Sequence, residues 1–221
     1  PKAGRNYFAN RSAVAFALML TTALALTTVI SRIADAAPDE NSVLRAEFTK
    51  SGEIKLPKNW RAWIFIGANL TPNALNGGKA IFPEYHYTYI EPSAWAYFKR
   101  TGKYAEGTQI VKELYLVAEG KNTDTNNGSS MTASGRGFQP GKALTLALEY
   151  KDSKRFPDNP GGWAFYDFSS GQSTYKDSAP AHPYERCAAC HELAKDTDYV
   201  FMQSYPVLLE RESLYAPLIR E

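Results

Sequence analysis

The two cysteines of the chain lie in the stretch CAACH, where Cys187 and Cys190 are followed at once by His191. C-x-x-C-H is the attachment motif of c-type haem: both thiols add to the porphyrin vinyl groups, and the histidine binds the iron. A thioredoxin-like thiol pair would follow an early strand, and a zinc site would need two further ligands. The motif therefore predicts one covalently attached haem c per chain, with His191 as the proximal iron ligand.

A second axial ligand is harder to find in the sequence. His86 stands in a tyrosine-rich stretch and reads as a structural or pocket histidine, and His182 lies in a proline-rich loop. Met202, in a short apolar stretch after the motif, reads as a core residue. The sequence thus predicts a five-coordinate iron with an open position, which favours binding or chemistry over simple electron transfer.

The stretch EGTQIVKELYLVAEG, residues 106–120, reads as a strand with one unusual side chain. Successive side chains of a strand point to opposite faces. One face is apolar apart from a central lysine; its residues are Thr108, Ile110, Lys112, Leu114 and Leu116. Burying an unpaired ammonium group is costly. Lys112 is therefore either a lysine that reaches solvent from an edge strand or a buried amine with a function.

The pattern of the remaining chain predicts an α+β domain. Stretches rich in aromatic and β-branched residues indicate about five strands, at residues 61–70, 84–92, 107–118, 143–152 and 161–170. A short helix is expected from Pro92 to Gly102, a polar loop over residues 119–142, and two short helices in the tail that carries the cysteine motif. Connections of turn or helix length favour an antiparallel sheet with helices packed on it.

The N-terminus resembles an export signal. Three basic residues precede an apolar run, residues 13–30, and the small residues Ala-Asp-Ala follow at 34–36. This order predicts a signal peptide cleaved after residue 36, rather than a retained membrane anchor, and a single domain over residues 37–221 in the periplasm. The 25 basic and 23 acidic residues of the chain fall to 21 and 22 once the four basic and one acidic residues of this segment are removed. A net charge of −1 without a basic run does not suggest a nucleic-acid partner.

Several blocks of the mature sequence resemble the cytochromes P-460. They are LPKNWRAWIFIGANLTPNALNGGKA, YIEPSAWAYFKRTGKYAEGTQIVKEL, KDSKRFPDNPGGWAFYDF and CAACHELAKDTDYVFMQSYPVL. The resemblance implies a periplasmic homodimer built on an antiparallel sheet, with one c-type haem per chain. It also implies a covalent bond from a lysine nitrogen to a porphyrin meso carbon, and the matching lysine is Lys112. Desolvation against the haem would lower the pKa of this amine and make it a nucleophile.

The resemblance implies oxidation of hydroxylamine, with nitric oxide, to nitrous oxide at a ferric haem. In members with this activity a glutamate in the strand before KDSKRF handles the proton, and the matching position here is Ala147. Glu149 lies two residues along on the same strand face, and His86 stands where some relatives carry arginine. These departures leave two hypotheses. The first is a hydroxylamine oxidoreductase that passes electrons to a small periplasmic acceptor. The second is a protein that binds nitric oxide or hydroxylamine with little or no turnover.

Five aromatic residues are candidates for the walls of a haem pocket or for the ordinary core. They are Phe82, Tyr87, Trp163, Phe165 and Tyr166.

Overall fold

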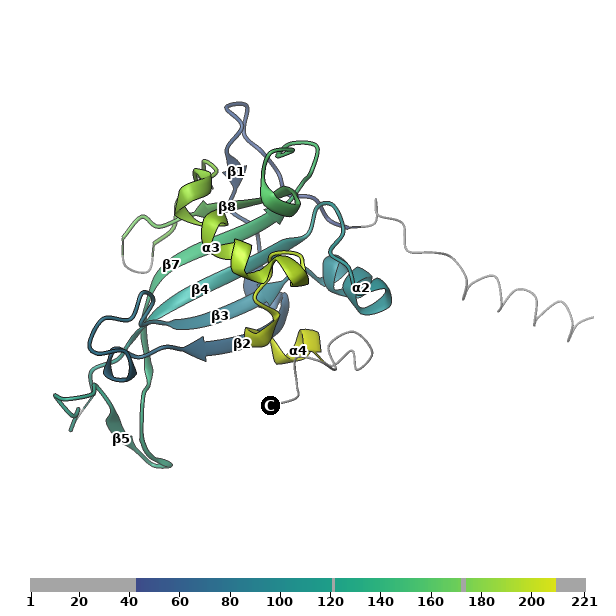
Figure 1. The fold of residues 1–221 in the computed structure, drawn as a ribbon. Helices are drawn as coiled ribbons and strands as arrows, with labels where there is room; N and C mark the ends of the chain where they lie inside the picture. Colours follow the sequence, from purple (N-terminus) through teal and green to yellow (C-terminus); the bar gives the residue numbers. More distant parts are fainter. Residues whose placement is uncertain (1–42, 121, 172–173, 210–221) are drawn as a thin grey trace, which may run out of the picture. The chain divides into compact units, whose positions relative to one another are not determined.

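The structure, a computed structural model, describes residues 43–120, 122–171 and 174–209 (Figure 1). Its elements are, in chain order, β1 (Ile54–Lys55), η2 (Trp60–Ala62), β2 (Ile64–Leu70), η3 (Asn73–Leu75), β3 (Tyr85–Ile90), α2 (Pro92–Thr101), β4 (Gln109–Val117), β5 (Ser130–Thr132), β6 (Gly135–Gly137), β7 (Pro140–Lys151), η4 (Pro160–Gly162), β8 (Trp163–Asp167), β9 (Ser178–Ala179), η5 (Tyr184–Arg186), α3 (Ala188–His191), η6 (Glu192–Thr197), η7 (Met202–Ser204) and α4 (Pro206–Leu209). The predicted signal peptide, residues 1–36, lies outside the described residues. Among the helices that are described, none is long and apolar enough to cross a membrane.

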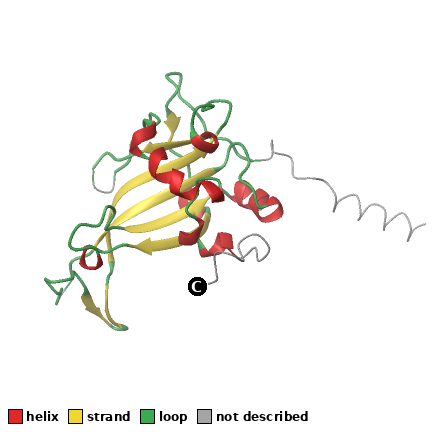
Figure 2. Cartoon of the chain, in the orientation of Figure 1, coloured by secondary structure: helices red, strands yellow, loops and turns green. Residues whose placement is uncertain are grey.

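Five antiparallel strands form the central sheet in the order β2–β3–β4–β7–β8 (Figure 2). This sheet and its packed helices confirm the predicted α+β class. Strand β4, which carries Lys112, is the middle strand, with β3 on one side and β7 on the other. Lys112 is therefore not on an edge strand, so the edge-strand explanation of its position is wrong.

The boundaries of three segments differ from the prediction. Strand β2 begins at Ile64, because Asn59 adopts a left-handed conformation (φ 56°) and opens the short 3-10 helix η2. The expected loop at residues 119–142 contains the hairpin β5–β6, and β7 already begins at Pro140. The tail forms several short helical pieces, α3, η6, η7 and α4, in place of two helices.

Helix α2 begins and ends where the sequence signals place it. The carboxylate of Glu91 accepts a hydrogen bond from the backbone N–H of Ala94 at 3.0 Å, and Pro92 occupies the first turn. Gly102 ends the helix in a left-handed conformation, with its N–H bonded to the carbonyl of Phe98 at 2.8 Å. The helix packs Ala94, Tyr97 and Phe98 into the core.

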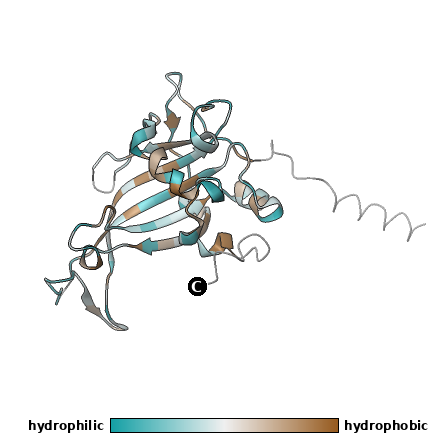
Figure 3. Ribbon diagram, in the orientation of Figure 1, coloured by the Kyte–Doolittle hydropathy of each residue, from teal (hydrophilic) through white to brown (hydrophobic). Residues whose placement is uncertain are grey.

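The sheet separates two apolar clusters, one against each face. The first cluster lies between the sheet, α2 and the C-terminal segment, and it includes Ile66, Ile90, Ile110 and Met202. The second lies on the opposite face and is made of Ile54, Val111, Leu146, Leu148, Tyr150, Ala164, Tyr166, Phe168 and Ala179. Ile110 and Val111 belong to different clusters, which confirms the alternation expected for this strand. Apolar and polar residues succeed one another along the central strands (Figure 3).

The C-terminal segment crosses the first face of the sheet (Figure 1). Helix α3 contacts β8, whereas η7 and α4 contact β2. The approach is closest at Gly67, where a Cβ atom would lie 2.5 Å from the backbone oxygen of Ser204. Strand β2 carries a register shift between Phe65 and Gly67 at the same place. A glycine is thus required for the segment to lie across the sheet.

Candidate haem site

The first face of the sheet is organised in cross-strand rows. Lys112 pairs with Thr88 on β3 and with Ala147 on β7, and Ala147 pairs with Asp167 on β8. Directly paired residues of a sheet present their side chains on the same face. Lys112 therefore lies between two small side chains, which leave space above the strand. The next row contains Ile110, paired with Glu149 on β7, and Glu149 is paired with Phe165 on β8.

The C-x-x-C-H motif lies above this part of the sheet. Cys187 precedes α3, and Cys190 and His191 form its last two residues. The backbone N–H of His191 bonds to the carbonyl of Cys187 at 3.3 Å, so one helical turn spans the motif. Neither cysteine is in a disulfide; Cys187 is half-buried and Cys190 is exposed. Both thiols are thus free for attachment to another group.

The charges around Cys187 identify its neighbours. Burial raises the pKa of its thiol, the Glu149 and Asp167 carboxylates raise it further, and Arg186 and Lys112 lower it. Charges act on a thiol in this way only when they are close to it. The predicted attachment cysteine and Lys112, which are 75 positions apart by their numbers in the sequence, therefore lie in one neighbourhood.

His191 is oriented as an iron ligand requires. Its Nδ1 lies 2.7 Å from the backbone oxygen of Tyr199, so Nδ1–H donates to that carbonyl and the lone pair is on Nε2. The Nε2 atom points to the carboxylate of Glu149, at 3.7 Å from Oε1, on the first face of the sheet. The rings of Phe165 and Phe201 lie 4.4 and 4.8 Å from the imidazole, centroid to centroid. An imidazole held this way presents Nε2 to a metal.

His86 lies on the same face, one row from Lys112. The side chain is 7% exposed, and its Nε2 has no hydrogen-bond partner in the described structure. Burial, with the nearby charge of Lys112, lowers the pKa of His86 to about 4, against a weaker opposing effect of a hydrogen bond to the Phe82 backbone. The imidazole is therefore neutral near pH 7. An unpaired buried nitrogen beside Lys112 is a feature that a bound polar group would explain.

The donor set on this face fits a c-type haem. It comprises two free thiols at the attachment spacing, an imidazole whose Nδ1 is already hydrogen-bonded so that Nε2 can bind iron, and an unpaired buried nitrogen of His86 on the strand beside Lys112. Of the other sixth-ligand candidates, Met202 stays apart from this set, whereas the backbone N–H of His182 bonds to the carbonyl of Phe165 at 2.8 Å. Met202 is fully buried and its sulfur accepts a hydrogen bond from the Tyr104 hydroxyl at 2.7 Å, so its core assignment fits. His182 is half-buried in the loop before the motif.

The aromatic candidates divide between the two faces. Phe165 contacts His191, and Trp163 belongs to the cluster of the first face. Tyr166 belongs to the opposite cluster, and Tyr87 pairs with Glu113, whose side chain also points away from Lys112. A place for Tyr87 or Tyr166 beside a group bound above Lys112 is therefore wrong. The alternation of the strand residues was sufficient to exclude both.

Two features of the site had no recognised signal in the sequence. Asp167 is half-buried in the row of Lys112 and accepts hydrogen bonds from the Thr145 hydroxyl at 2.7 Å and the Ser169 N–H at 2.8 Å. Although burial opposes it, these hydrogen bonds lower the pKa of Asp167. Asp167 lies on the first face because it comes two residues after Phe165 in β8, and alternate residues of a strand share a face. The second feature is the Tyr199 carbonyl, whose position depends on backbone angles that no residue pattern indicates.

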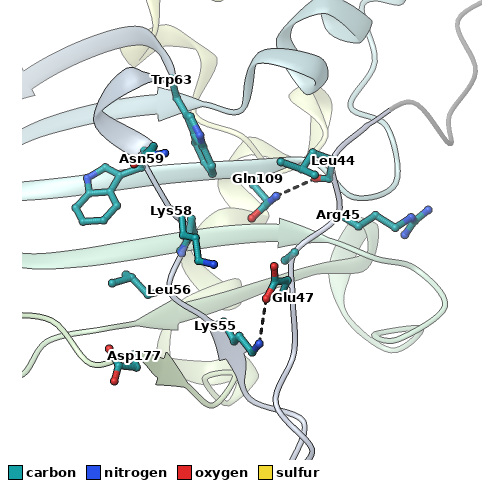
Figure 4. Close-up of a pocket in the computed structure, with 13 residues that line it drawn as sticks. Leu44, Arg45, Glu47, Lys55, Leu56, Lys58, Asn59, Trp63, Gln109 and Asp177 are labelled. Carbon is teal, nitrogen blue, oxygen red and sulfur yellow. Dashed lines mark hydrogen bonds and ion pairs between the residues drawn. The ribbon is translucent and has the colours of Figure 1, made fainter.

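A hollow of about 600 Å³ lies on the opposite face of the sheet (Figure 4). Charges of both signs line it, and the Lys55 ammonium pairs with the Glu47 carboxylate at 3.0 Å. Gln109, which is buried at its floor, donates to the Leu44 carbonyl at 2.9 Å. It contains none of the predicted site residues, so it is not the candidate haem site.

A comparison with known protein families matches the part of the chain that contains this site. The family model described as Cytochrome P460 matches residues 57–202, more than half of the chain and a span that includes Lys112, Ala147 and His191. No curated protein matches the chain.

Proposed function

Because the chain belongs to the cytochrome P460 family, a family of haem proteins, we propose that it is a periplasmic mono-haem c-type cytochrome that oxidises hydroxylamine. The proposed reaction combines hydroxylamine with nitric oxide and yields nitrous oxide, water, one proton and one electron. The observation that carries the proposal is that the C-x-x-C-H motif lies over the face of Lys112: Nε2 of His191 is 3.7 Å from Glu149, which is two residues from Ala147, the β7 partner of Lys112.

In this proposal Cys187 and Cys190 hold the porphyrin through thioether bonds, and His191 binds the iron through Nε2. The haem supplies an open iron position and accepts electrons from the substrate. Lys112 would supply a third covalent attachment, from its nitrogen to a porphyrin carbon; this bond would replace one N–H and one C–H bond and would require a two-electron oxidant. The small neighbours Thr88 and Ala147 support this role, because they leave the lysine free to reach above the sheet.

Proton handling is where this chain differs from the hydroxylamine-oxidising pattern. A base must lie within hydrogen-bond reach of the substrate, directly or through one water. Ala147 has no group that accepts a proton. Glu149 is on the same face but its carboxylate faces His191 at 3.7 Å, and His86 is neutral with an unpaired Nε2. We propose that His86 or a water bound beside it takes the proton, with Glu149 as the weaker candidate.

The alternative function is a protein that binds nitric oxide or hydroxylamine with little or no turnover. The specific observation in its favour is the row Thr88–Lys112–Ala147, in which no carboxylate adjoins the lysine. Asp167, beyond Ala147 in the same row, is held by the Thr145 hydroxyl and the Ser169 backbone N–H. In this alternative, alanine at position 147 leaves the chain without the base that turnover needs.

The haem attachment is tested by a peptide map of the purified mature protein. Mass spectrometry should find the haem-bearing peptide with Cys187 and Cys190 joined also to the peptide with Lys112. Attachment through the cysteines alone would make Lys112 an ordinary strand lysine and would contradict the P-460 type of haem. No haem on either cysteine would contradict the whole proposal.

Turnover is tested with Ala147→Glu. Because the substitution introduces a base beside Lys112, we expect hydroxylamine oxidation to increase about a hundredfold or more, the usual contribution of a positioned base. Ala147→Gln is the matched control, since it has the same size without a proton acceptor. If both variants keep the native rate, the missing base does not limit this chain.

The partners and the compartment are proposals that rest on the resemblance. We propose a homodimer that passes electrons to a small periplasmic acceptor. Apolar surface for a second copy is available on the face away from Lys112, where the rings of Phe65 and Tyr89 lie 5.6 Å apart and Phe65 is 46% exposed. Light scattering of the purified mature protein should give twice the monomer mass, whereas a monomer at micromolar concentration would contradict the homodimer.

A further inference from the structure

We infer that Lys151 and Asp198 are positioning residues for the proximal histidine: their ion pair holds the backbone carbonyl of Tyr199 against His191. The inference rests on the proposed role of His191 as the haem ligand. It concerns how the chain fixes this ligand, which neither the motif nor the family match assigns.

The carbonyl belongs to an unusual piece of backbone. Asp198 and Tyr199 both have positive φ, 54° and 64°. Left-handed conformations are uncommon for residues other than glycine, and a bulky tyrosine adopts them rarely. Two such residues in succession persist only where the surrounding structure holds them, and such strain is often found at functional sites.

Lys151 binds this segment through its ammonium group. Its Nζ lies 3.0 Å from Oδ2 of Asp198 and 2.6 Å from the backbone oxygen of Gly161. The residue is 9% exposed, and its ammonium also lies over the ring of Trp163, 5.2 Å from the ring centre. The end of β7 is thereby tied to the Asp198 turn and to the connection before β8.

Gly161 allows the two segments to meet. A Cβ atom at this position would lie 2.7 Å from Cδ2 of Tyr199 and 2.9 Å from Oδ1 of Asp198. The glycine itself has φ 60°. The left-handed segment is therefore packed against backbone on one side and bound to Lys151 at its carboxylate, so its position is well fixed.

The consequence for His191 is direct. The Tyr199 N–H bonds to the Ala194 carbonyl at 2.8 Å, and the Tyr199 carbonyl accepts the Nδ1–H of His191 at 2.7 Å. A hydrogen bond to the second nitrogen of a ligating histidine fixes its tautomer and ring orientation and raises its basicity. A more basic ligand favours ferric over ferrous iron. The Lys151–Asp198 pair, which touches neither His191 nor a substrate, would thus influence the haem through one carbonyl.

The experiment compares Lys151→Met and Asp198→Asn in the haem-loaded protein with the native chain. Two properties are measured: the ferric–ferrous reduction potential, and the iron–histidine stretching frequency of the reduced protein by resonance Raman. We expect both variants to lower the stretching frequency and to shift the ferric–ferrous equilibrium about tenfold toward ferrous iron, a rise of about 59 mV in potential. The double variant should match Lys151→Met, because that single variant already lacks both the ion pair with Asp198 and the bond to Gly161.

Two controls separate positioning from general stability. Lys151→Arg keeps the charge and should keep the native frequency. Lys55→Met removes a lysine–carboxylate pair of the same 3.0 Å length on β1, distant from the motif, and should leave both haem properties unchanged. Asp198→Asn is expected to fold, since asparagine has a similar shape to aspartate and tolerates a left-handed backbone.

The outcomes are distinct. Variants that lose thermal stability but keep the native potential and frequency would make the pair merely structural and would overturn the inference. A native protein without an iron–histidine band would instead refute His191 as the haem ligand, and the inference would fall with the proposed function.

Discussion

Lys112 and Glu113 are neighbours in the sequence whose charged groups leave opposite faces of β4. Lys112 lies between Thr88 and Ala147 on the first face. Glu113 is 0% exposed on the other face, where its carboxylate pairs with Arg61 and accepts a hydrogen bond from the Tyr175 hydroxyl at 2.7 Å. The sequence singled out only the lysine, because its face is otherwise apolar, whereas the face of Glu113 also contains the polar residue Gln109.

His86 gives the first prediction at the residue scale. Its pKa is about 4 in the folded chain against 6.5 for an ordinary histidine, so between these values the unfolded chain binds more protons. The free energy of unfolding should therefore fall as the pH drops from about 6.5 to about 4, by about 3 kcal/mol in total. Thermal melting of the native chain and of His86→Gln over this range measures the difference.

His86→Gln should lack this part of the slope, because glutamine does not titrate. His182→Gln is the comparison: burial also lowers the pKa of this half-buried histidine, so the variant should lose only a smaller part of the slope. A slope shared by the native chain and His86→Gln would show that other groups cause the loss. If Lys112 is bonded to the porphyrin, its charge no longer lowers the pKa of His86. The pH dependence of the native chain should then be shallower, but burial still lowers this pKa, so stability should still fall with the pH.

The elements differ in how far the sequence specifies them. The strands of the central sheet and helix α2 were predicted, because alternation, Pro92 and Gly102 are local signals. The C-terminal segment was not, since its broken helices depend on contacts with β2 and β8. The left-handed backbone of Tyr199, which positions His191, has no local signal either. The candidate ligands could be named from the sequence, but what holds them in place could not.

Gly67 gives a prediction at the scale of elements. In Gly67→Ala the new methyl group would meet the Ser204 carbonyl oxygen at 2.5 Å, and this oxygen is backbone that cannot rotate away. The C-terminal segment must then move off β2, and we expect a loss of about 1–3 kcal/mol in the free energy of unfolding, measured with urea. The haem absorption band should also shift, because this segment continues from His191.

Gly137→Ala is the matched control for this substitution. The position lies in a strand, without a positive φ, and no atom would lie within 4 Å of the new methyl group. We expect its stability and absorption to remain native. Equal effects of the two substitutions would mean that the close approach at Gly67 is not what constrains the segment.

At the scale of the whole molecule, the sheet divides the core into two layers with different tasks. The layer with the C-terminal segment contains the candidate haem site, whereas the opposite layer contains Val111, Tyr150 and Tyr166. The fully buried Glu113 faces this opposite side, directly behind Lys112. Arg61, which pairs with it, is half exposed, with 56% of its side-chain surface accessible.

Arg61→Met tests whether the two layers act independently. The substitution leaves the buried Glu113 carboxylate without its cation, and breaking such a pair costs about 3–5 kcal/mol; the half-exposed arginine favours the lower end. Adding Glu113→Gln removes the charge and should recover most of this loss, because the amide still accepts from Tyr175. Urea unfolding measures the free energy of unfolding of Arg61→Met and of the double variant. The haem absorption and the peptide linkage of Lys112 should remain native in both variants, since neither residue faces the site. A shifted absorption band in Arg61→Met would contradict this separation and would mean that the charge behind Lys112 acts on the haem through the sheet.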